Sequence, residues 1–265
     1  MIKSSKYVKK IRSTNVYDVA NKSPITKAEG LSLQYKNNIL LKREDMQPVF
    51  SFKLRGAYNK LSKLNKNGKN KSVIAASAGN HAQGVAFASL KLGLKATIVM
   101  PVTTPSIKID SVKRFGAKII LNGDNFDEAF KFAKEMSKKK KATFIHPYDD
   151  PDVIAGQGTI GMEIIEALDE DVDAIFVPVG GGGLLAGVGA YIKSINPKIK
   201  IYGVEPEDAA CLDAAVKANK RVSLKEVGLF ADGVAVKQIG KTTYSLIEEW
   251  IDGVVTVSVD EICAA

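Results

Sequence analysis

The feature that most constrains the fold is a regular alternation of short β-rich runs and longer helical patterns from residue 72 onward. A parallel sheet whose faces are both covered by helices produces this alternation, because each strand must be followed by a crossover helix. Apolar runs and turn residues predict strands over 73–76, 96–100, 117–121, 142–145, 174–179, 199–204 and 254–259. Helical spacing predicts helices over 80–92, 106–115, 125–138, 152–168, 184–194, 208–218 and 241–250.

Turn-forming residues divide this pattern into two units. One such stretch, 65–70, precedes the first strand, and another, 146–151, follows the fourth. We therefore expect an α/β protein with two parallel-sheet, three-layer domains. A small domain of residues 72–149 would be inserted into a large domain made of residues 1–71 and 150–265.

The C-terminal residues suggest an interrupted element. Residues 260–265 have the character of a first helical turn, and Asp260 would be its N-cap. We expect the chain to be truncated there and the large domain to be incomplete. An incomplete sheet could expose an edge strand.

Composition excludes several function classes. Apolar residues make up 45% of the 265 residues and charged residues 25%, as in ordinary globular proteins. The net charge of +9 comes from scattered lysines without interleaved aromatic residues, so nucleic-acid binding is not expected. No apolar run is long enough to span a bilayer, and the N-terminus has no secretory pattern, so we expect a cytoplasmic protein without a membrane partner. Cys211 and Cys263 are far apart and indicate reduced thiols.

Two turns that join a strand to a helix are suited to bind anions. Residues 180–183 are four consecutive glycines, and Ser77-Ala78-Gly79-Asn80-His81 follows the strand 73–76. The N–H groups of such turns can point into one space, and the helix N-terminus adds partial positive charge. The second turn also has a simpler interpretation, in which Ser77 or Asn80 only caps the following helix.

Lys53 is the candidate nucleophile. It follows Phe52 in the turn before an apolar helical run, and Pro48 and Phe50 lie close by in sequence. Most lysines are solvated surface residues, but these neighbours predict partial shielding. Burial and the charge of Arg55 would lower the pKa of the amine, as Schiff-base chemistry requires. A reactive amine and two amide-rich turns are the parts needed to hold a phosphorylated aldehyde cofactor.

The sequence contains no other recognisable catalytic or metal-binding motif. His81 and His146 are the only histidines, and two distant histidines do not form a metal site. The chain lacks the GxSxG, HExxH and paired-cysteine motifs. We therefore expect no metal cofactor.

The chain resembles the pyridoxal-phosphate enzymes of fold type II, and among them most closely the threonine dehydratases of the biosynthetic type. The motifs that carry the resemblance cover essentially the whole chain: residues 41–45, 51–58, 76–84, 177–184 and 228–236. The resemblance implies a fold like that of the tryptophan synthase β subunit and a homo-oligomer, dimeric or tetrameric. It implies the dehydration and deamination of L-threonine, and also L-serine, with 2-oxobutanoate and ammonia formed from threonine in the first step of isoleucine biosynthesis.

The same resemblance implies roles for individual residues. Lys53 would bind pyridoxal 5'-phosphate covalently and then take the Cα proton of the substrate. The phosphate would be bound by Gly180, Gly181, Gly182, Gly183 and Leu184. Asn80 would bond the phenolic oxygen, and Phe52 and Gly233 would flank the ring. The substrate carboxylate would be bound by the backbone of Ser77, Ala78, Gly79, Asn80 and His81.

Two residues depart from the pattern of the serine racemases, which the chain also resembles. Those enzymes carry a serine at the position of Ala78, on the ring face opposite the lysine, where it can return a proton to Cα. Alanine cannot, so we expect elimination without racemisation. Racemase-like relatives also bind a divalent metal near the position of Glu205, but Cys211 stands where an acidic ligand is expected, so no metal is predicted there.

Three functions remain open at this stage. The chain could be the catalytic portion of a threonine dehydratase, or an inactive fragment that only binds the cofactor. It could also be another enzyme of the same fold, such as a serine dehydratase or racemase, or a synthase that replaces the β-substituent. The family's partner for the pyridine nitrogen and its regulatory domain would lie beyond residue 265, which leaves the activity of this chain undecided.

Overall fold

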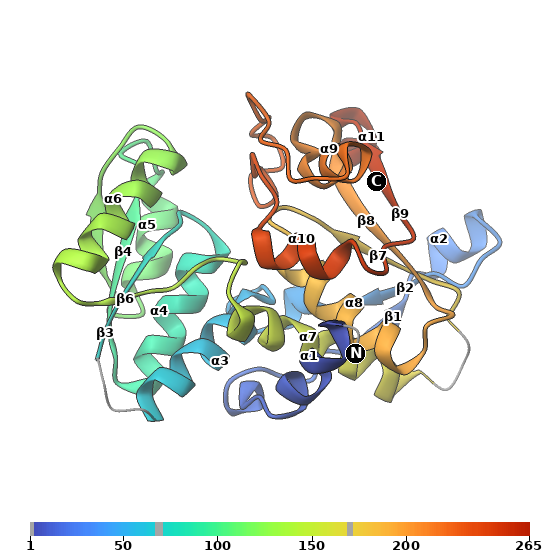
Figure 1. The fold of residues 1–265 in the computed structure, drawn as a ribbon, viewed down its shortest axis with the longest axis horizontal. Helices are drawn as coiled ribbons and strands as arrows, with labels where there is room; N and C mark the ends of the chain where they lie inside the picture. The colour runs from blue at the N-terminus through green and yellow to red at the C-terminus, as the bar shows by residue number, and fades with distance from the viewer. Residues whose placement is uncertain (1–2, 67–70, 169–171) are drawn as a thin grey trace.

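The computed structural model describes residues 3–66, 71–168 and 172–265, which form two parallel sheets and one short antiparallel pair (Figure 1). The sheet orders are β5-β4-β3-β6, β7-β8-β9 and β1-β2. The strands are β1 (Ile25–Lys27), β2 (Leu40–Lys42), β3 (Ser72–Ala76), β4 (Lys95–Met100), β5 (Lys118–Leu121), β6 (Thr143–Phe144), β7 (Ala174–Pro178), β8 (Lys200–Pro206) and β9 (Gly253–Val257). The helices are α1 (Lys3–Arg12), α2 (Glu29–Gln34), α3 (Lys53–Lys66), α4 (Asn80–Leu92), α5 (Ser106–Lys113), α6 (Phe126–Lys139), α7 (Pro151–Ala167), α8 (Gly183–Ile195), α9 (Cys211–Ala218), α10 (Lys241–Ile247) and α11 (Val259–Ala264).

Strand β3 shows how the sequence builds the four-stranded sheet. Successive side chains of a strand point to opposite faces. Val73 and Ala75 pack with apolar residues of α3 and α4, whereas Ile74 and Ala76 pack with residues of α6. The run of apolar residues is therefore buried on both faces, and this sheet is the middle of three layers.

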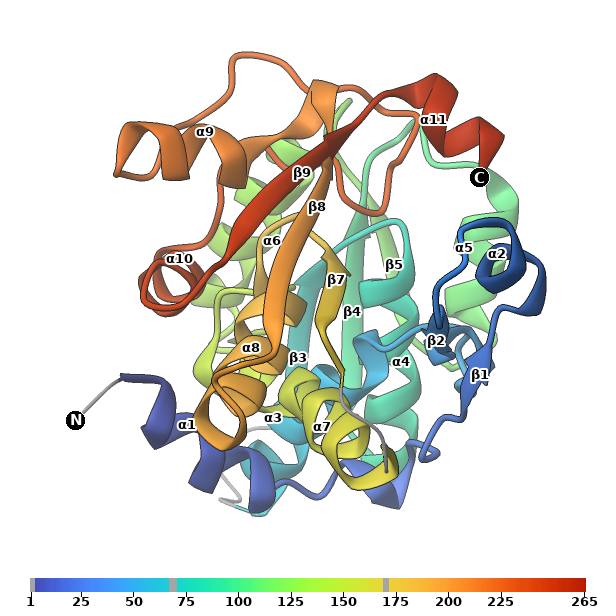
Figure 2. The same ribbon diagram turned by 90° about the vertical axis from the view of Figure 1, so that its right-hand side faces the viewer.

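The three-stranded sheet is packed on the face that meets α8. Ile201 of β8 is fully buried in a core that includes residues of α1, α7, α8 and α10. On the other face Phe176 stacks on Tyr202 with ring centres 5.2 Å apart, and Phe176 is 61% exposed. Figure 2 shows these three strands side by side. The outer face of this sheet thus exposes aromatic surface.

Helix α3 belongs to both halves of the molecule. Ala57 and Leu61 are buried in the core of the four-stranded sheet, although α3 also packs along α7. The division into residues 72–149 and the remainder stays a proposal, supported by the fact that all four strands of that sheet lie within 72–149. Residues 67–70 of the predicted boundary turn lie outside the described residues. Over the ranges that the structure describes, no helix has both the length and the apolar character needed to cross a membrane.

The predicted alternation of strands and helices is confirmed, with shifts at several ends. The helix expected over 208–218 becomes a 3-10 turn, Glu207–Ala209, followed by α9. The start of α9 is displaced because the Glu205 carboxylate accepts the N–H groups of Leu212 (2.8 Å) and Asp213 (2.9 Å). The pairing of β1 with β2 in the first 50 residues was not predicted, because each strand has only three residues.

Asp260 is not the N-cap of the last helix, so this prediction is wrong. Ser258 takes that position, and its hydroxyl accepts the N–H of Glu261 at 3.2 Å. The Glu261 carboxylate in turn accepts the N–H of Ser258 at 2.8 Å. The two bonds form a capping box, which satisfies two helix-end donors at once and outcompetes a cap two residues later.

Candidate active site

One pocket gathers every residue that the sequence singled out for cofactor or substrate binding. It has a volume of about 580 Å³ and lies where β3 and β7 end, so both amide-rich turns reach it. The predicted residues that line it are Phe52, Lys53, Ser77, Ala78, Gly79, Asn80, His81, Gly180, Gly181, Gly182, Gly183, Leu184 and Gly233. Sequence reasoning missed further lining residues, among them Lys108, Tyr148 and Asp232. Lys108 lies in α5 and Tyr148 in the loop between β6 and α7, outside the motifs that carry the resemblance, whereas Asp232 lies within residues 228–236, directly before Gly233.

Lys53 is the first residue of α3, and its amine enters the pocket. Its Nζ lies 3.5 Å from the carbonyl oxygen of Pro147 and 5.2 Å from the ring centre of Phe52. Burial lowers the pKa of this amine from 10.5 to about 8. The expected shielding by Pro48 and Phe50 is wrong, because both are exposed. Phe52 is the aromatic residue that covers the amine.

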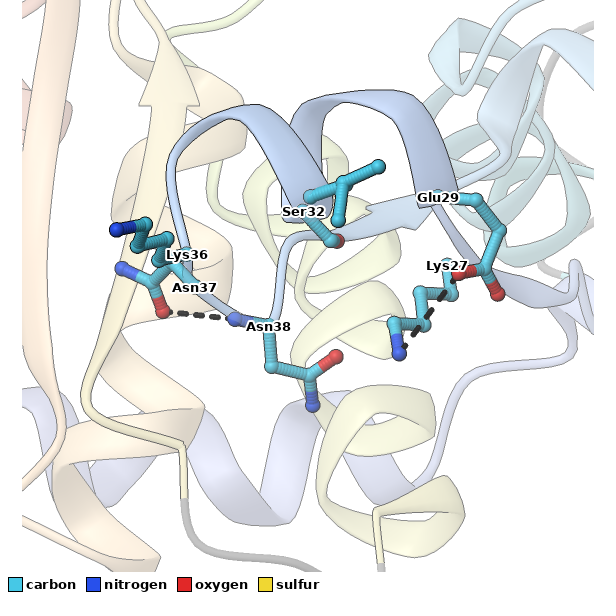
Figure 3. A pocket seen from close by; sticks show the side chains of 7 residues that line it. Lys27, Glu29, Ser32, Lys36, Asn37 and Asn38 are labelled. Carbon is cyan, nitrogen blue, oxygen red and sulfur yellow. Dashed lines mark hydrogen bonds and ion pairs between the residues drawn. The ribbon is translucent and has the colours of Figure 1, made fainter.

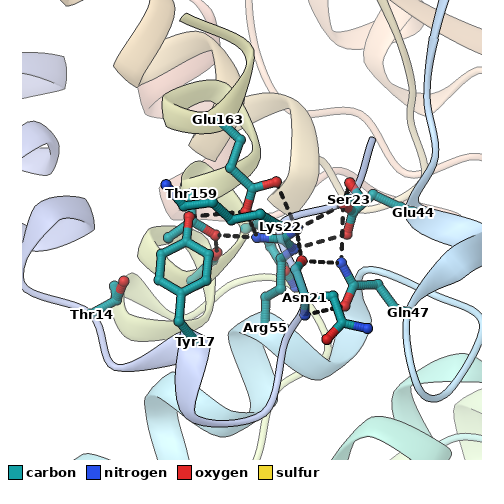
Figure 4. A network of polar contacts seen from close by, with 12 residues as sticks. Thr14, Tyr17, Asn21, Lys22, Ser23, Glu44, Gln47, Arg55, Thr159 and Glu163 are labelled. Atoms are coloured by element: carbon teal, nitrogen blue, oxygen red, sulfur yellow. Dashed lines mark hydrogen bonds and ion pairs between the residues drawn. The ribbon is translucent and has the colours of Figure 1, made fainter. Parts of the chain in front are cut away.

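Arg55 has a different role from the one expected, because its charge does not contribute to the pKa shift of Lys53. Its side chain is fully buried and donates hydrogen bonds to Glu44 (2.8 Å), Thr159 (3.0 Å) and Glu163 (3.1 Å) (Figure 4). Lys42 adds a bond to Glu163 at 2.7 Å. The charges of two cations and two carboxylates therefore cancel in this network. Its hydrogen bonds connect the first turn of α3 to α7.

The network also controls the protonation of Glu163. Burial alone would raise the pKa of this carboxyl group. Hydrogen bonds from Arg55 and Lys42 outweigh burial and hold the pKa of Glu163 below its usual value. The carboxylate thus stays charged at neutral pH and keeps Arg55 directed away from the pocket.

The four-glycine turn is built around positions where a side chain does not fit. Gly182 has a φ of +85°, a left-handed conformation that favours glycine. A Cβ at Gly181 would lie 2.3 Å from the ring of Tyr148. The chain therefore needs glycine here both for backbone conformation and for close packing against Tyr148.

The N–H groups of this turn are available for a ligand. Within the described part of the chain, none of the six successive N–H groups from Gly180 to Leu185 donates a hydrogen bond. The first intrahelical bond of α8 runs from Ala186 to the carbonyl of Gly182 at 2.8 Å, and no side chain caps this helix. Unsatisfied N–H groups at a helix N-terminus attract an anion such as a phosphate.

The turn at residues 77–81 provides a second set of amides. Neither Ser77 nor Asn80 caps α4: the N-cap is Gly79, without a side-chain cap bond, so the simpler capping interpretation is wrong. The Ser77 hydroxyl instead accepts the N–H of Gly79 at 3.1 Å, inside the turn. The N–H groups of Ala78, Asn80 and His81 donate no hydrogen bond among the described residues. This turn can therefore bind a second anion, such as a carboxylate.

Both histidines have structural contacts that fit a neutral ring. His81 Nε2 lies 3.1 Å from the carbonyl oxygen of Ile145, and burial followed by the charge of Lys53 lowers its pKa to about 3. His146 Nδ1 accepts the N–H of Asp149 at 2.9 Å, and burial lowers its pKa to about 4. Neither ring is arranged to exchange a proton near neutral pH.

The predicted absence of a metal near Glu205 stays a prediction. Both carboxylate oxygens of Glu205 already accept N–H groups at the start of α9, and burial raises the pKa of this carboxyl group to about 7. Cys211 lies beside it and is also buried. A metal ion would have to displace the hydrogen bonds that start α9.

A second hollow, of about 500 Å³, lies beside α2 on the protein surface (Figure 3). It is lined by Lys27, Glu29, Ser32, Leu33, Lys36, Asn37 and Asn38. Its polar contacts are between near neighbours in sequence, such as the 3.8 Å ion pair of Lys27 with Glu29. It contains none of the predicted site residues, so we assign it no function.

The comparisons with known proteins agree with this pocket. Residues 16–265 match the protein family described as pyridoxal-phosphate dependent enzyme. The chain belongs to this family of pyridoxal-phosphate dependent enzymes. Pyridoxal phosphate has both an aldehyde, which an amine can bind, and a phosphate, which backbone N–H groups can bind.

Threonine dehydratases are similar to this chain in both sequence and fold. It is 57% identical over 259 residues to threonine dehydratase 1 biosynthetic, chloroplastic, of Solanum lycopersicum, a match of 98% of this chain and 43% of that protein. The solved structure of the processed form of threonine deaminase isoform 2 from Solanum lycopersicum has a TM-score of 0.96 and 52% identity. The match covers 99% of this chain and 76% of that one.

A racemase of the same fold is more distant. Maize serine racemase has a TM-score of 0.92 and 30% identity, covering 98% of this chain and 78% of that one. The chain spans about half the length of the curated relatives it matches. The fold expected from the resemblance to fold type II enzymes is confirmed by these structural likenesses.

Proposed function

We propose that the protein is a pyridoxal-phosphate-dependent ammonia-lyase that converts L-threonine, and also L-serine, into a 2-oxo acid and ammonia. Threonine would give 2-oxobutanoate, in the first step of isoleucine biosynthesis. The observation that carries the proposal is one pocket lined both by Lys53, whose amine has a pKa near 8, and by Gly180 to Leu184, whose N–H groups donate no hydrogen bond among the described residues. The likeness to threonine dehydratases supports the choice of substrate.

The residues present fit pyridoxal phosphate at both of its ends. The N–H groups of Gly180 to Leu184 would bind the phosphate, and Lys53 would bind the aldehyde carbon. The Asn80 side chain is exposed on the pocket wall and would donate to the phenolic oxygen. Phe52 and Gly233 would flank the ring, since both line the pocket and nothing lies within 4 Å of a Cβ at Gly233.

The chain's own groups would bind the substrate and move its proton. The N–H groups of Ala78, Asn80 and His81 would bind the carboxylate and thereby orient the Cα–H bond. The bound cofactor supplies a ring that withdraws electrons from Cα. The Lys53 amine would take the Cα proton, because a pKa near 8 leaves a useful fraction of neutral amine at physiological pH.

Ala78 favours elimination over racemisation. It lines the same pocket as Lys53 and has no group that can return a proton to Cα. A racemase needs a second acid on the ring face opposite the first base. We therefore expect the protein to act as a lyase, and we expect a single substitution at residue 78 to add racemisation.

The proposal is tested by adding pyridoxal phosphate to the purified protein and recording visible absorbance and 2-oxo-acid formation from threonine. We expect a new absorbance band and 2-oxobutanoate, both lost in Lys53→Ala. A band without any 2-oxo acid would favour a cofactor-binding fragment instead. No band with the unmodified protein would contradict the proposed function.

The proposal includes a cytoplasmic location and a homo-oligomer. Both cysteines are free, and Cys263 is exposed, which suits a reducing compartment. Leu33 and Tyr35 in and after α2 are 83% and 63% exposed, and such apolar groups suit contact with another subunit. Light scattering on the purified protein tests the second point: a monomer at micromolar concentration would contradict it.

A further inference from the structure

The four-glycine turn is held from behind by the segment that begins α10. The carbonyl oxygen of Gly181 accepts two hydrogen bonds, from the N–H of Gly240 at 3.2 Å and from the hydroxyl of Thr243 at 2.8 Å. Thr243 is fully buried, so water does not compete for this bond. Neither donor lines the pocket, although Gly181 does.

These bonds fix the direction of an N–H group in the candidate phosphate site. A peptide unit is planar and trans, so the carbonyl of Gly181 and the N–H of Gly182 point in opposite directions. Holding the carbonyl toward α10 therefore aims the N–H of Gly182 away from α10, on the side of the turn that lines the pocket. The preceding carbonyl is held in a similar way, because the thiol of Cys211 donates to the carbonyl oxygen of Gly180 with a distance of 3.4 Å from Sγ.

The first turn of α10 is in turn held by a residue remote in sequence. Its N-cap is Gly240, which has no side chain to cap the helix. The carboxylate of Asp149, between β6 and α7, accepts the N–H groups of Lys241 (2.9 Å), Thr242 (2.7 Å) and Thr243 (3.3 Å). An ionised acceptor at a helix N-terminus makes strong bonds and suits the helix dipole.

The segment around Asp149 also contacts the opposite side of the turn. The adjacent Tyr148 packs its ring against Gly181, and a Cβ at Gly240 would lie 2.8 Å from the Asp149 carboxyl carbon. The turn is thus enclosed between residues 148–149 and residues 240–243. Displacement of either segment would leave the amide-rich turn free to rotate its peptide units.

We infer that Thr243 and Asp149 are positioning residues for phosphate binding: Thr243 orients the Gly181–Gly182 peptide unit, and Asp149 holds Thr243 in place. The inference rests on the proposed function, in which this pocket binds pyridoxal phosphate. It predicts a specific effect. Loss of either contact weakens binding of a ligand that has a phosphate and leaves binding of the same ligand without phosphate nearly unchanged.

The test compares pyridoxal phosphate with pyridoxal in the purified protein, by absorbance titration. Thr243→Val removes the hydroxyl and keeps the shape of the side chain. We expect it to raise the Kd for pyridoxal phosphate about tenfold, the size of one buried hydrogen bond. The Kd for pyridoxal should change less than about twofold, because pyridoxal has no phosphate for the turn to bind.

Three further variants serve as controls. Thr243→Ser keeps the hydroxyl and should bind both ligands nearly as the unmodified protein does. Thr242→Val makes the same chemical change one residue away, at a hydroxyl that makes no hydrogen bond to the glycine turn, and should also bind normally. Asp149→Asn removes the charge that caps α10 and should weaken pyridoxal phosphate binding in the same selective way.

The outcomes separate this inference from the proposed function. Equal losses for both ligands in Thr243→Val and Asp149→Asn would show a general structural role and overturn the inference. Unchanged binding in both variants would overturn it as well, while leaving the proposed function intact. If Thr243→Val does not fold, Asp149→Asn decides. Failure of the unmodified protein to bind pyridoxal phosphate would instead reject the proposed function and the inference together.

Discussion

The side chains of Lys53 and Arg55 extend from the first turn of α3 into two different environments. The amine of Lys53 lies 3.5 Å from the carbonyl oxygen of Pro147 in the pocket, whereas the guanidinium of Arg55 donates to Glu163 at 3.1 Å in the buried interior. Two residues along a helix correspond to about 200° of rotation, so the two side chains point to nearly opposite faces. The same helical turn therefore presents a reactive amine on one face and is anchored through the other.

Arg55→Met should strongly destabilise the protein. The substitution leaves the carboxylates of Glu44 and Glu163 without their main partner, and breaking such a buried pair costs about 3–5 kcal/mol. Urea unfolding at pH 7 measures the loss of free energy. Arg43→Met is the matched control, since Arg43 is paired with Asp45 at the exposed surface and should matter little.

The cost of Arg55→Met should shrink in acid. The pKa of Glu163 is depressed in the native protein, so the stability it contributes is present above its ordinary pKa of 4.5 and is lost as pH falls through the lower native value. In the variant, burial is no longer opposed by Arg55, and Glu163 can become neutral at higher pH. A difference between the two proteins that stays constant from pH 7 to pH 4 would contradict this account.

Covalent capture of pyridoxal phosphate should depend on pH with a midpoint near 8. The neutral amine is the nucleophile, and burial lowers the pKa of Lys53 to about 8. The rate of the absorbance change should rise up to about pH 8 and then level off. Borohydride trapping followed by peptide mass spectrometry should locate the label on Lys53. A rate that keeps rising toward pH 10.5 would indicate an ordinary exposed lysine.

The same pKa shift makes a prediction about stability. The native protein holds the amine of Lys53 less protonated than the unfolded chain does, for which the pKa is 10.5. Unfolding therefore takes up protons between about pH 8 and pH 10.5, and the contribution of Lys53 to stability increases with pH over that window. Lys53→Met, which cannot titrate, should lack this increase. Parallel curves of unfolding free energy against pH for the two proteins would refute it.

Two glycine substitutions should separate folding from ligand binding. A Cβ at Gly181 collides with the Tyr148 ring, so Gly181→Ala should lower the stability of the ligand-free protein by about 1–3 kcal/mol and also weaken pyridoxal phosphate binding. A Cβ at Gly233 meets no protein atom within 4 Å, so Gly233→Ala should weaken only ligand binding. Thermal unfolding with and without ligand measures both effects. Normal ligand affinity in Gly233→Ala would remove Gly233 from the site.

Ala78→Ser should add racemase activity. The residue lines the pocket together with Lys53, and a hydroxyl there could return a proton to Cα from a second direction. We expect conversion of L-serine to D-serine to rise by about a hundredfold or more, in line with the effect of a positioned acid. Chiral chromatography of the remaining substrate measures it. Ala78→Cys gives a second donor of similar size, and no D-serine from either variant would show that residue 78 does not face Cα.

Local patterns were sufficient for most of the fold, for the two amide-rich turns and for Lys53, whereas Gly233 was predicted only from the resemblance to fold type II enzymes. Periodicity located β3, α4, β7 and α8 because apolar spacing and glycine stops act within a few residues. Local patterns did not predict the start of the last helix correctly, because the capping box between Ser258 and Glu261 starts the helix two residues before Asp260. They also failed for Arg55, because its partner Glu163 lies 108 residues away in sequence.

The sequence by itself determined the α/β alternation, the two amide-rich turns and the lysine that precedes an apolar helix, since each depends on interactions between near neighbours. Only the tertiary structure decided which charges Arg55 balances and how Asp149 holds the first turn of α10. Arg55 and Glu163 are 108 residues apart in sequence, and Asp149 and Thr243 are 94 apart, so the geometry of both contacts depends on how the sheets and helices pack. The direction in which an N–H group points at Gly182 is likewise a consequence of that packing, although the glycine itself can be read in the chain.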